Sequence, residues 1–132
     1  MKVFADFSGN KRFDLKILGH KLATDLGTEK GGADSAPGPL ELFAASFATC
    51  VGYYALGYLA TAKFDASGLS VEVDWNLDEK GTRIASLHAH VKVPNADLGE
   101  RKHGVLAAME KCIVHNTLKN YPDIKFDVEG KS

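Results

Sequence analysis

The sequence predicts an α+β protein in which antiparallel strands surround one long helix. First, residues 42–62 form a run of 21 positions that contains no charged residue and no proline. Second, stretches in which apolar and polar residues alternate, a pattern typical of half-buried strands, lie on both sides of this run. Third, short turn signals separate neighbouring strands. Hairpins, rather than the crossovers that a parallel sheet requires, therefore connect them.

Composition is consistent with a single domain over residues 1–132. Hydrophobic residues make up 45% of the chain and charged residues 25%, as is usual for globular proteins. The net charge of −1 gives no electrostatic reason to expect binding to nucleic acid or to an anionic membrane. The first residues lack the apolar core of a signal peptide, so we expect a cytoplasmic protein. Nothing in the pattern calls for a metal or a bound cofactor.

The N-terminal third predicts a small sheet followed by a long loop. Residues 2–7 and 12–17 alternate as two strands of a hairpin, although Phe4 breaks the alternation, and residues 21–25 could add a short third strand. Residues 26–39 are rich in glycine and proline, and loops of this length inside a small domain are often functional. Pro39 and Glu41 then mark the start of a helix, where proline and a carboxylate are both favoured.

A membrane span is one interpretation of the long apolar run, because about 20 apolar residues can cross a bilayer. Alanine, glycine, serine, threonine and tyrosine make up most of it, so a buried central helix is the better interpretation. Its apolar side chains point in most directions, which predicts a helix covered on nearly every side. Its small residues would allow another backbone to approach closely.

The second half predicts strands over residues 69–77 and 84–93, a helical region over 95–120 and a last strand over 123–128. His88 and His90 are two positions apart and therefore share one face of their strand. A metal site is one interpretation of this pair. Exposed polar positions on a half-buried strand are the favoured one.

The two cysteines are the candidates for chemistry. Cys50 lies in the long helix and Cys112 in the later helical region, 62 positions away, which fits neither a disulfide framework nor a zinc motif. They are either two buried small residues, which the pattern alone favours, or a redox pair. A reactive thiol needs a nearby cation or helix N-terminus, and access. Arg12 is a candidate cation, although the pattern alone favours an exposed strand residue. His115 could supply a proton to Cys112 or be an ordinary surface residue.

Three blocks of the sequence, PLELFAASFATC, GLSVEVDW and EKCIVHNTL, resemble the OsmC/Ohr family. The resemblance implies an OsmC-like fold, in which antiparallel sheets wrap two long central helices of an intertwined homodimer. It implies that Cys50 attacks an organic hydroperoxide and becomes a sulfenic acid, with which Cys112 then forms a disulfide. It also implies that a lipoyl-type dithiol reductant restores both thiols.

Two positions depart from the family pattern. Ohr-type sites carry a glutamate ten positions before the first cysteine, paired with an arginine that matches Arg12. Here Leu40 occupies that position, and Glu41 stands nine before Cys50, about 180° around the helix instead of about 80°. Glu41 is therefore either a site residue or a helix-start carboxylate. Ile113 replaces the proline that follows the second cysteine in many relatives, which predicts that Cys112 lies inside a helix.

The leading hypothesis is thus a thiol-dependent peroxidase of organic hydroperoxides, with Cys50, Cys112, Arg12 and Glu41 as catalytic residues. The first alternative is a protein of the same fold that binds a small hydrophobic ligand, its cysteines being core residues. The second is a thiol sensor that signals oxidation to a partner.

Overall fold

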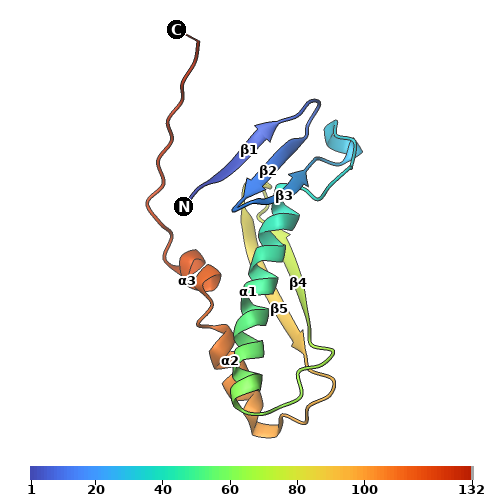
Figure 1. The fold of residues 1–132 in the computed structure, drawn as a ribbon, viewed down its shortest axis with the longest axis vertical. Coiled ribbons are helices and arrows are strands. Elements are labelled where there is room, and N and C mark those ends of the chain that lie inside the picture. The colour runs from blue at the N-terminus through green and yellow to red at the C-terminus, as the bar shows by residue number, and fades with distance from the viewer. Residues whose placement is uncertain (132) are drawn as a thin grey trace. The chain divides into compact units, whose positions relative to one another are not determined.

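The computed structural model describes residues 1–131 of the chain. Contacts between residues divide it into two compact units, one of residues 1–46 and one that begins at Phe47. Helix α1 (Pro39–Thr61) begins in the first unit and ends in the second (Figure 1). Proline in the first turn and Glu41 near the N-terminus favour its start, as predicted. At its end Lys63 adopts a left-handed conformation and the Phe64 N–H donates to the Leu59 carbonyl, a Schellman-type ending.

The N-terminal unit contains an antiparallel sheet of three strands, β1 (Val3–Phe7), β2 (Phe13–Ile17) and β3 (His20–Thr24), in the order β1-β2-β3 (Figure 1). This confirms the predicted hairpin and the third strand. Alternation places apolar side chains on one face, where the Phe7 and Phe13 rings meet edge to face with centroids 5.8 Å apart. Much of this apolar face is exposed, because Phe7 retains 65% of its accessible surface.

One buried carboxylate anchors the loop that follows β3. The side chain of Asp25 is only 2% exposed, and its Oδ1 accepts the Leu26 N–H at 2.8 Å. Its Oδ2 accepts both the N–H of Ser35, at 3.0 Å, and the hydroxyl of Ser35, at 2.6 Å. The bonds from Ser35 contribute most to lowering the pKa of Asp25, to about 2. The loop, which includes the short 3₁₀ helix η1 (Thr28–Lys30), is therefore closed on itself through Asp25.

The second unit contains a hairpin of β4 (Ser70–Leu77) and β5 (Ile84–Lys92), again as predicted. Its outward face is polar, with Glu72 opposite His90 and Asp74 opposite His88. This confirms that the two histidines are exposed polar positions. Residues 1–131 contain no group of three histidine, cysteine or acidic residues suited to a metal ion.

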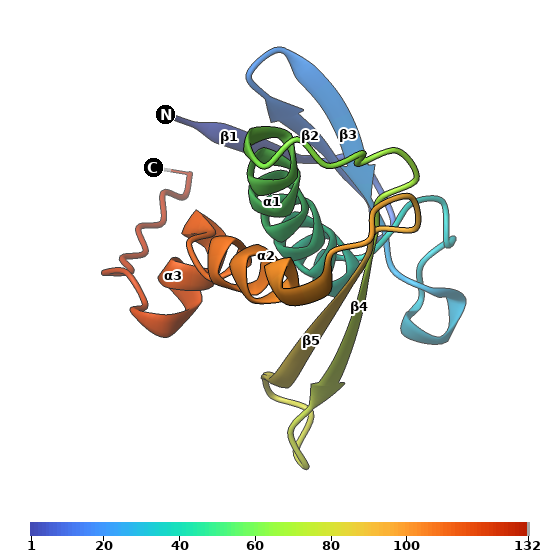
Figure 2. The ribbon, with the colours of Figure 1, turned by 90° about the horizontal axis from the view of Figure 1, so that it is seen from below.

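The inward face of the hairpin packs against α1 and α2 (Lys102–Met109), which lie beside each other in Figure 2. Residues of α1 four positions apart form one buried stripe on this side, a spacing that places them on one helix face. Its members are Phe47, Val51, Ala55 and Leu59. Burial of a side chain such as Leu59, which is 0% exposed, stabilises the fold by about 1.5–3 kcal/mol.

The other side of α1 is uncovered in the single chain, where Tyr53 is 73% and Leu56 42% exposed. The prediction of a helix covered on nearly every side is thus wrong for one chain, because one hairpin and one short helix cover one side only. Among the described residues, α1 is one helix long and apolar enough to cross a membrane, with 33% of the relevant window buried. Central helices of soluble proteins share that length and composition, so this is weak evidence for a membrane span.

The predicted helical region 95–120 is three shorter pieces: η2 (Gly99–Arg101), α2 and α3 (Ile113–Lys119). The chain turns at Cys112, whose ψ of 131° is extended, and whose sulfur accepts the His115 N–H at the start of α3. The prediction that Cys112 lies inside a helix is therefore wrong. The break needs no proline, because the cysteine sulfur itself caps the new helix.

The predicted last strand, residues 123–128, is also wrong for the single chain, since this segment has no strand structure. Its alternating side chains Ile124, Phe126 and Val128 are 68%, 91% and 96% exposed. Alternation predicts which side chains share a face, but a strand also needs a neighbour for its backbone hydrogen bonds. No described residue of this chain supplies that edge.

Gly104→Ala tests the packing of α2 on α1. A Cβ at position 104 would overlap the Tyr58 ring, whose hydroxyl accepts a hydrogen bond from Arg101 at 3.2 Å. We expect Gly104→Ala to lower the free energy of unfolding by about 1–3 kcal/mol, which is the usual cost of overpacking. Urea denaturation measures this change. Gly57→Ala is the matched control, because a Cβ there meets nothing within 4 Å. Equal stability of Gly104→Ala and wild type would contradict the described packing.

The low pKa of Asp25 predicts a contribution to acid stability. Because the folded pKa of about 2 lies below the unfolded value of 3.8, the unfolded chain binds this proton more readily. The contribution of Asp25 to stability is therefore complete above pH 3.8, and it is lost as the pH falls from 3.8 towards 2. Asp25→Asn should lower the melting temperature at pH 7 and flatten its decline in acid, measured by circular dichroism. Asp123→Asn, an exposed control, should do neither, and identical acid profiles for all three proteins would contradict the prediction.

Candidate functional site

Cys50 and Cys112 meet in the core of the C-terminal unit. Cys50 lies on α1 and is half-buried, whereas Cys112, between α2 and α3, is 0% exposed. Both are free thiols, and both belong to the apolar cluster built around Phe47 and Val51. Residues 62 positions apart in the sequence are thus side by side in the fold. This closeness makes a disulfide between them the simplest chemistry available to the pair.

The surroundings of Cys112 keep it in the thiol form. Burial raises the pKa of Cys112, and the hydrogen bond with the Cys50 side chain raises it further. The N–H groups of His115, at 3.4 Å from the sulfur, and of Val114 act in the opposite direction but are outweighed. At neutral pH Cys112 is therefore a neutral thiol, with two backbone donors placed to stabilise negative charge when it develops on the sulfur.

His115 contacts Cys112 through its backbone. Its ring Nδ1 lies 2.9 Å from the Glu110 carbonyl oxygen. A carbonyl oxygen can only accept, so Nδ1 carries the hydrogen of this bond. This hydrogen bond fixes the ring against the turn between α2 and α3. The role of His115 as a proton source stays a prediction, whereas its N–H is a direct partner of the sulfur.

Arg12 lies in the N-terminal unit, just before β2. Its Nη1 donates to the Ser35 hydroxyl oxygen at 2.9 Å, and its Nε lies 3.3 Å from Asp14 Oδ1. Ser35 in turn donates to Asp25, so the guanidinium is tied to the anchored loop. This places Arg12 in a defined network instead of on a bare strand surface. Its action on Cys50 stays a prediction.

Glu41 lies in the first turn of α1 and is exposed. Its carboxylate folds back over Gly38, because a Cβ at position 38 would stand 2.8 Å from Glu41 Oε2. This position fits a carboxylate that complements the positive end of the helix dipole. Its participation at Cys50 stays a prediction.

Sequence reasoning missed the residues that hold these groups in place. The loop anchor Asp25 and its partner Ser35 carry a signal that was available, since aspartate and serine near a turn commonly bond to backbone N–H groups. The capping of α3 by Cys112 carried no such signal, because cysteine is not a usual helix cap.

Two hollows in the C-terminal unit could accept small apolar molecules. One, of about 370 Å³, lies between β5 and α2 and is lined by Val91, Leu98, Val105, Leu106 and Met109 among others. Another, of about 300 Å³, lies between α1 and the start of β4. Both volumes are within the usual range for ligand sites. Neither hollow is lined by a cysteine.

Comparison with known proteins identifies the fold as OsmC-like. The family model described as OsmC-like protein matches residues 31–127. A structure from Psychrobacter arcticus 273-4, named for osmotic stress induction and a detoxification response, is similar with a TM-score of 0.80 and 18% identity, over 89% of this chain and 87% of that one. The organic hydroperoxide resistance protein OsmC of Legionella pneumophila is similar with a TM-score of 0.67 and 21% identity, over 90% of each chain.

An organic hydroperoxide resistance protein of Elizabethkingia anophelis is also similar, with a TM-score of 0.67 and 20% identity, over 92% of this chain and 90% of that one. No protein of curated function matches the sequence. Likeness at these identities establishes the fold, an α+β arrangement with antiparallel sheets. Since the family model covers residues 31–127, the chain belongs to the OsmC-like family.

Proposed function

We propose that this protein is a thiol-dependent peroxidase that reduces organic hydroperoxides to alcohols. The observation that carries the proposal is the contact between the half-buried Cys50 and the fully buried Cys112. Family membership supports it, as do two similar structures that are named organic hydroperoxide resistance proteins. A pair of adjacent free thiols is what a two-cysteine peroxidase requires.

The first step uses Cys50 as the nucleophile. Its thiolate attacks the terminal peroxide oxygen, so that an S–O bond forms and the O–O bond breaks. The alkoxide leaves and takes up a proton as the alcohol, and Cys50 becomes a sulfenic acid. In this proposal Arg12 holds the thiolate and Glu41 pairs with Arg12, which are the roles that the family resemblance implies.

The second step uses Cys112. Its sulfur attacks the sulfenic sulfur of Cys50, water leaves, and a disulfide forms. The raised pKa of Cys112 suits this order, because a neutral thiol does not compete with Cys50 for peroxide. The N–H of His115 then stabilises the charge that develops on the attacking sulfur. A lipoyl-type dithiol reduces the disulfide by exchange and leaves as its own disulfide, which restores both thiols.

We further propose that the working form is a cytoplasmic homodimer. Three apolar surfaces of the single chain support an obligate partner: the uncovered side of α1 at Tyr53 and Leu56, the apolar face of β1–β3, and the C-terminal segment at Ile124 and Phe126. A second copy would bury these surfaces and supply a strand edge for residues 123–128. Peroxides with an apolar substituent would be preferred where such an interface leaves an apolar pocket.

The second candidate function is binding of a small hydrophobic ligand. The hollow of about 370 Å³ between β5 and α2 favours it, because its largely apolar lining, which also includes His88, His90 and Lys102, contains neither cysteine. In that case both thiols would be core residues and would react slowly with alkylating reagents.

The test is the intact mass of the reduced protein after one equivalent of cumene hydroperoxide, beside hydrogen peroxide. We expect rapid loss of two hydrogens in the wild type, faster with the organic peroxide, and recovery of the thiols with dihydrolipoamide. Cys112→Ser should stop at the sulfenic acid, and Cys50→Ser should not react. If the wild-type mass is unchanged over minutes, the peroxidase proposal is wrong and a search for a bound ligand follows.

A further inference from the structure

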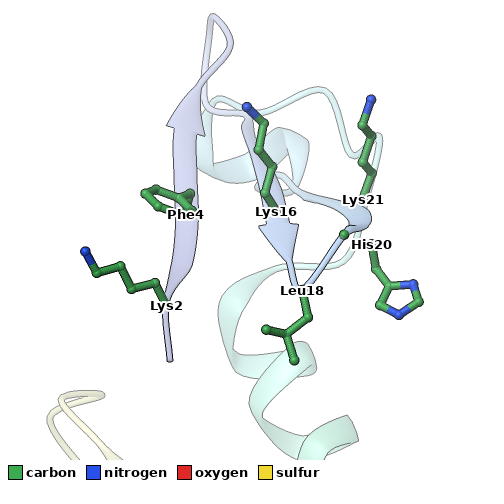
Figure 3. A pocket seen from close by; sticks show the side chains of 7 residues that line it. Lys2, Phe4, Lys16, Leu18, His20 and Lys21 are labelled. Atoms are coloured by element: carbon green, nitrogen blue, oxygen red, sulfur yellow. The ribbon is translucent and has the colours of Figure 1, made fainter.

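A hollow of about 340 Å³ lies on the N-terminal sheet and is formed entirely by residues of that unit. Figure 3 shows its lining, with Lys2 just before β1, Phe4 on β1, Lys16 on β2, and Leu18, His20 and Lys21 at the β2–β3 turn and on β3. Its volume is within the range of small-molecule sites. It includes neither cysteine and none of the residues assigned to the peroxidase.

Two apolar side chains are exposed in this hollow without a structural reason. Phe4 lies directly opposite Lys16, on the face of the sheet that also carries Asp6, Asp14 and Lys21, and is 54% exposed. Leu18 is 74% exposed. Apolar side chains gathered on a polar face, with charged residues around them, are typical of a binding surface.

The backbone at Leu18 is also unfavourable for leucine. Leu18 and Gly19 both have positive φ, 49° and 86°, as a tight hairpin turn requires. Asparagine or glycine is usual at the first of these positions, and a residue with a bulky side chain costs about 1–2 kcal/mol there. In this conformation, and with its side chain largely in solvent, leucine stabilises the turn less than asparagine would.

The charges around the apolar floor are poorly balanced. Lys16 and Lys21 lie directly opposite each other on β2 and β3, an arrangement that repels, and they extend in the same direction in Figure 3. Lys16 approaches Asp6 at 3.7 Å. Within residues 1–131, Lys2 and Lys21 have no carboxylate within 4.0 Å. An anion placed in the hollow would relieve the repulsion.

We infer that this hollow binds a free fatty acid, an amphiphilic anion with one hydrocarbon chain and one carboxylate. Its hydrocarbon chain covers Phe4 and Leu18, and its carboxylate accepts hydrogen bonds from the lysine ammonium groups. The free surface has two unfavourable features, the exposed apolar side chains and the unbalanced lysine charges. A fatty acid removes both, because its hydrocarbon chain covers the apolar side chains and its carboxylate neutralises lysine charge.

Other anions fit less well. No arginine lines the hollow, so it lacks the bidentate fork that recognises phosphate. Phe4 is the one phenylalanine, tyrosine or tryptophan in the lining, so no row of such rings is present to stack successive nucleic-acid bases. The net charge of −1 for the whole chain also disfavours general attraction to polyanions.

The test is a titration of the full-length, isotope-labelled protein with sodium decanoate below its micellar concentration, followed by amide NMR. We expect saturable shifts at Phe4, Lys16, Leu18, Gly19 and Lys21, weakened by added salt. Decyltrimethylammonium, with the same chain length and opposite charge, should produce no saturable shift there. The Cys50→Ser/Cys112→Ser protein should bind equally well, so the result does not depend on the peroxidase proposal.

Leu18→Asn is the decisive variant, because asparagine suits the turn. We expect it to raise the melting temperature while decanoate binding weakens by about tenfold, the factor for losing a partly buried leucine contact. Lys21→Gln should also weaken binding, whereas Lys92→Gln, an exposed lysine on β5, should not. The inference is overturned if no shift appears on β1–β3, if phosphatidylglycerol vesicles cause shifts that decanoate does not, or if Leu18→Asn binds like wild type.

Discussion

Burial along one side of α1 is the interaction on which the C-terminal unit depends. Phe47, Val51, Ala55 and Leu59 recur every four residues and bring the inner face of the β4–β5 hairpin and α2 against the same helix. Each large side chain in this stripe removes apolar surface from water, which is the dominant favourable term in folding. Cys50 lies beside the stripe, so packing, and not a covalent or metal link, positions the thiol pair.

The same packing sets the chemistry of the two sulfurs apart. Cys112 is fully buried, and burial raises its pKa. The break between α2 and α3 nevertheless turns the His115 N–H onto the sulfur. A thiol that is protonated at rest and has a donor ready for its thiolate is suited to the second step of the proposed cycle. Cys50, less buried and on a continuous helix, is suited to the first.

Much of the fold followed from local pattern. Alternation predicted β1, β2, β4 and β5, a turn signal indicated a possible third strand where β3 lies, and Pro39 and Glu41 predicted the start of α1. Two of the errors share one cause, because an alternating or apolar pattern predicts which side chains share a face but not what packs against them. Residues 123–128 alternate like a strand but have no edge to pair with in one chain. The uncovered side of α1 has the same explanation.

The site was predictable only in part. The cysteines were found from their sequence blocks, but their contact depends on the turn at Cys112, which the absence of proline had argued against. Asp25 and Ser35, which tie Arg12 to its loop, were not singled out, because their roles depend on hydrogen bonds between residues ten positions apart. Long-range partners of this kind are set by tertiary structure.

The central claim is that Cys50 and Cys112 are close enough to pair within one folded chain. The most direct measurement is oxidation of the native protein with the thiol oxidant diamide, followed by non-reducing peptide mapping and circular dichroism. The account predicts a single intrachain Cys50–Cys112 disulfide, formed without loss of helical signal. Retention of both thiols in the folded protein, or a disulfide that forms only between chains or only after unfolding, would contradict it.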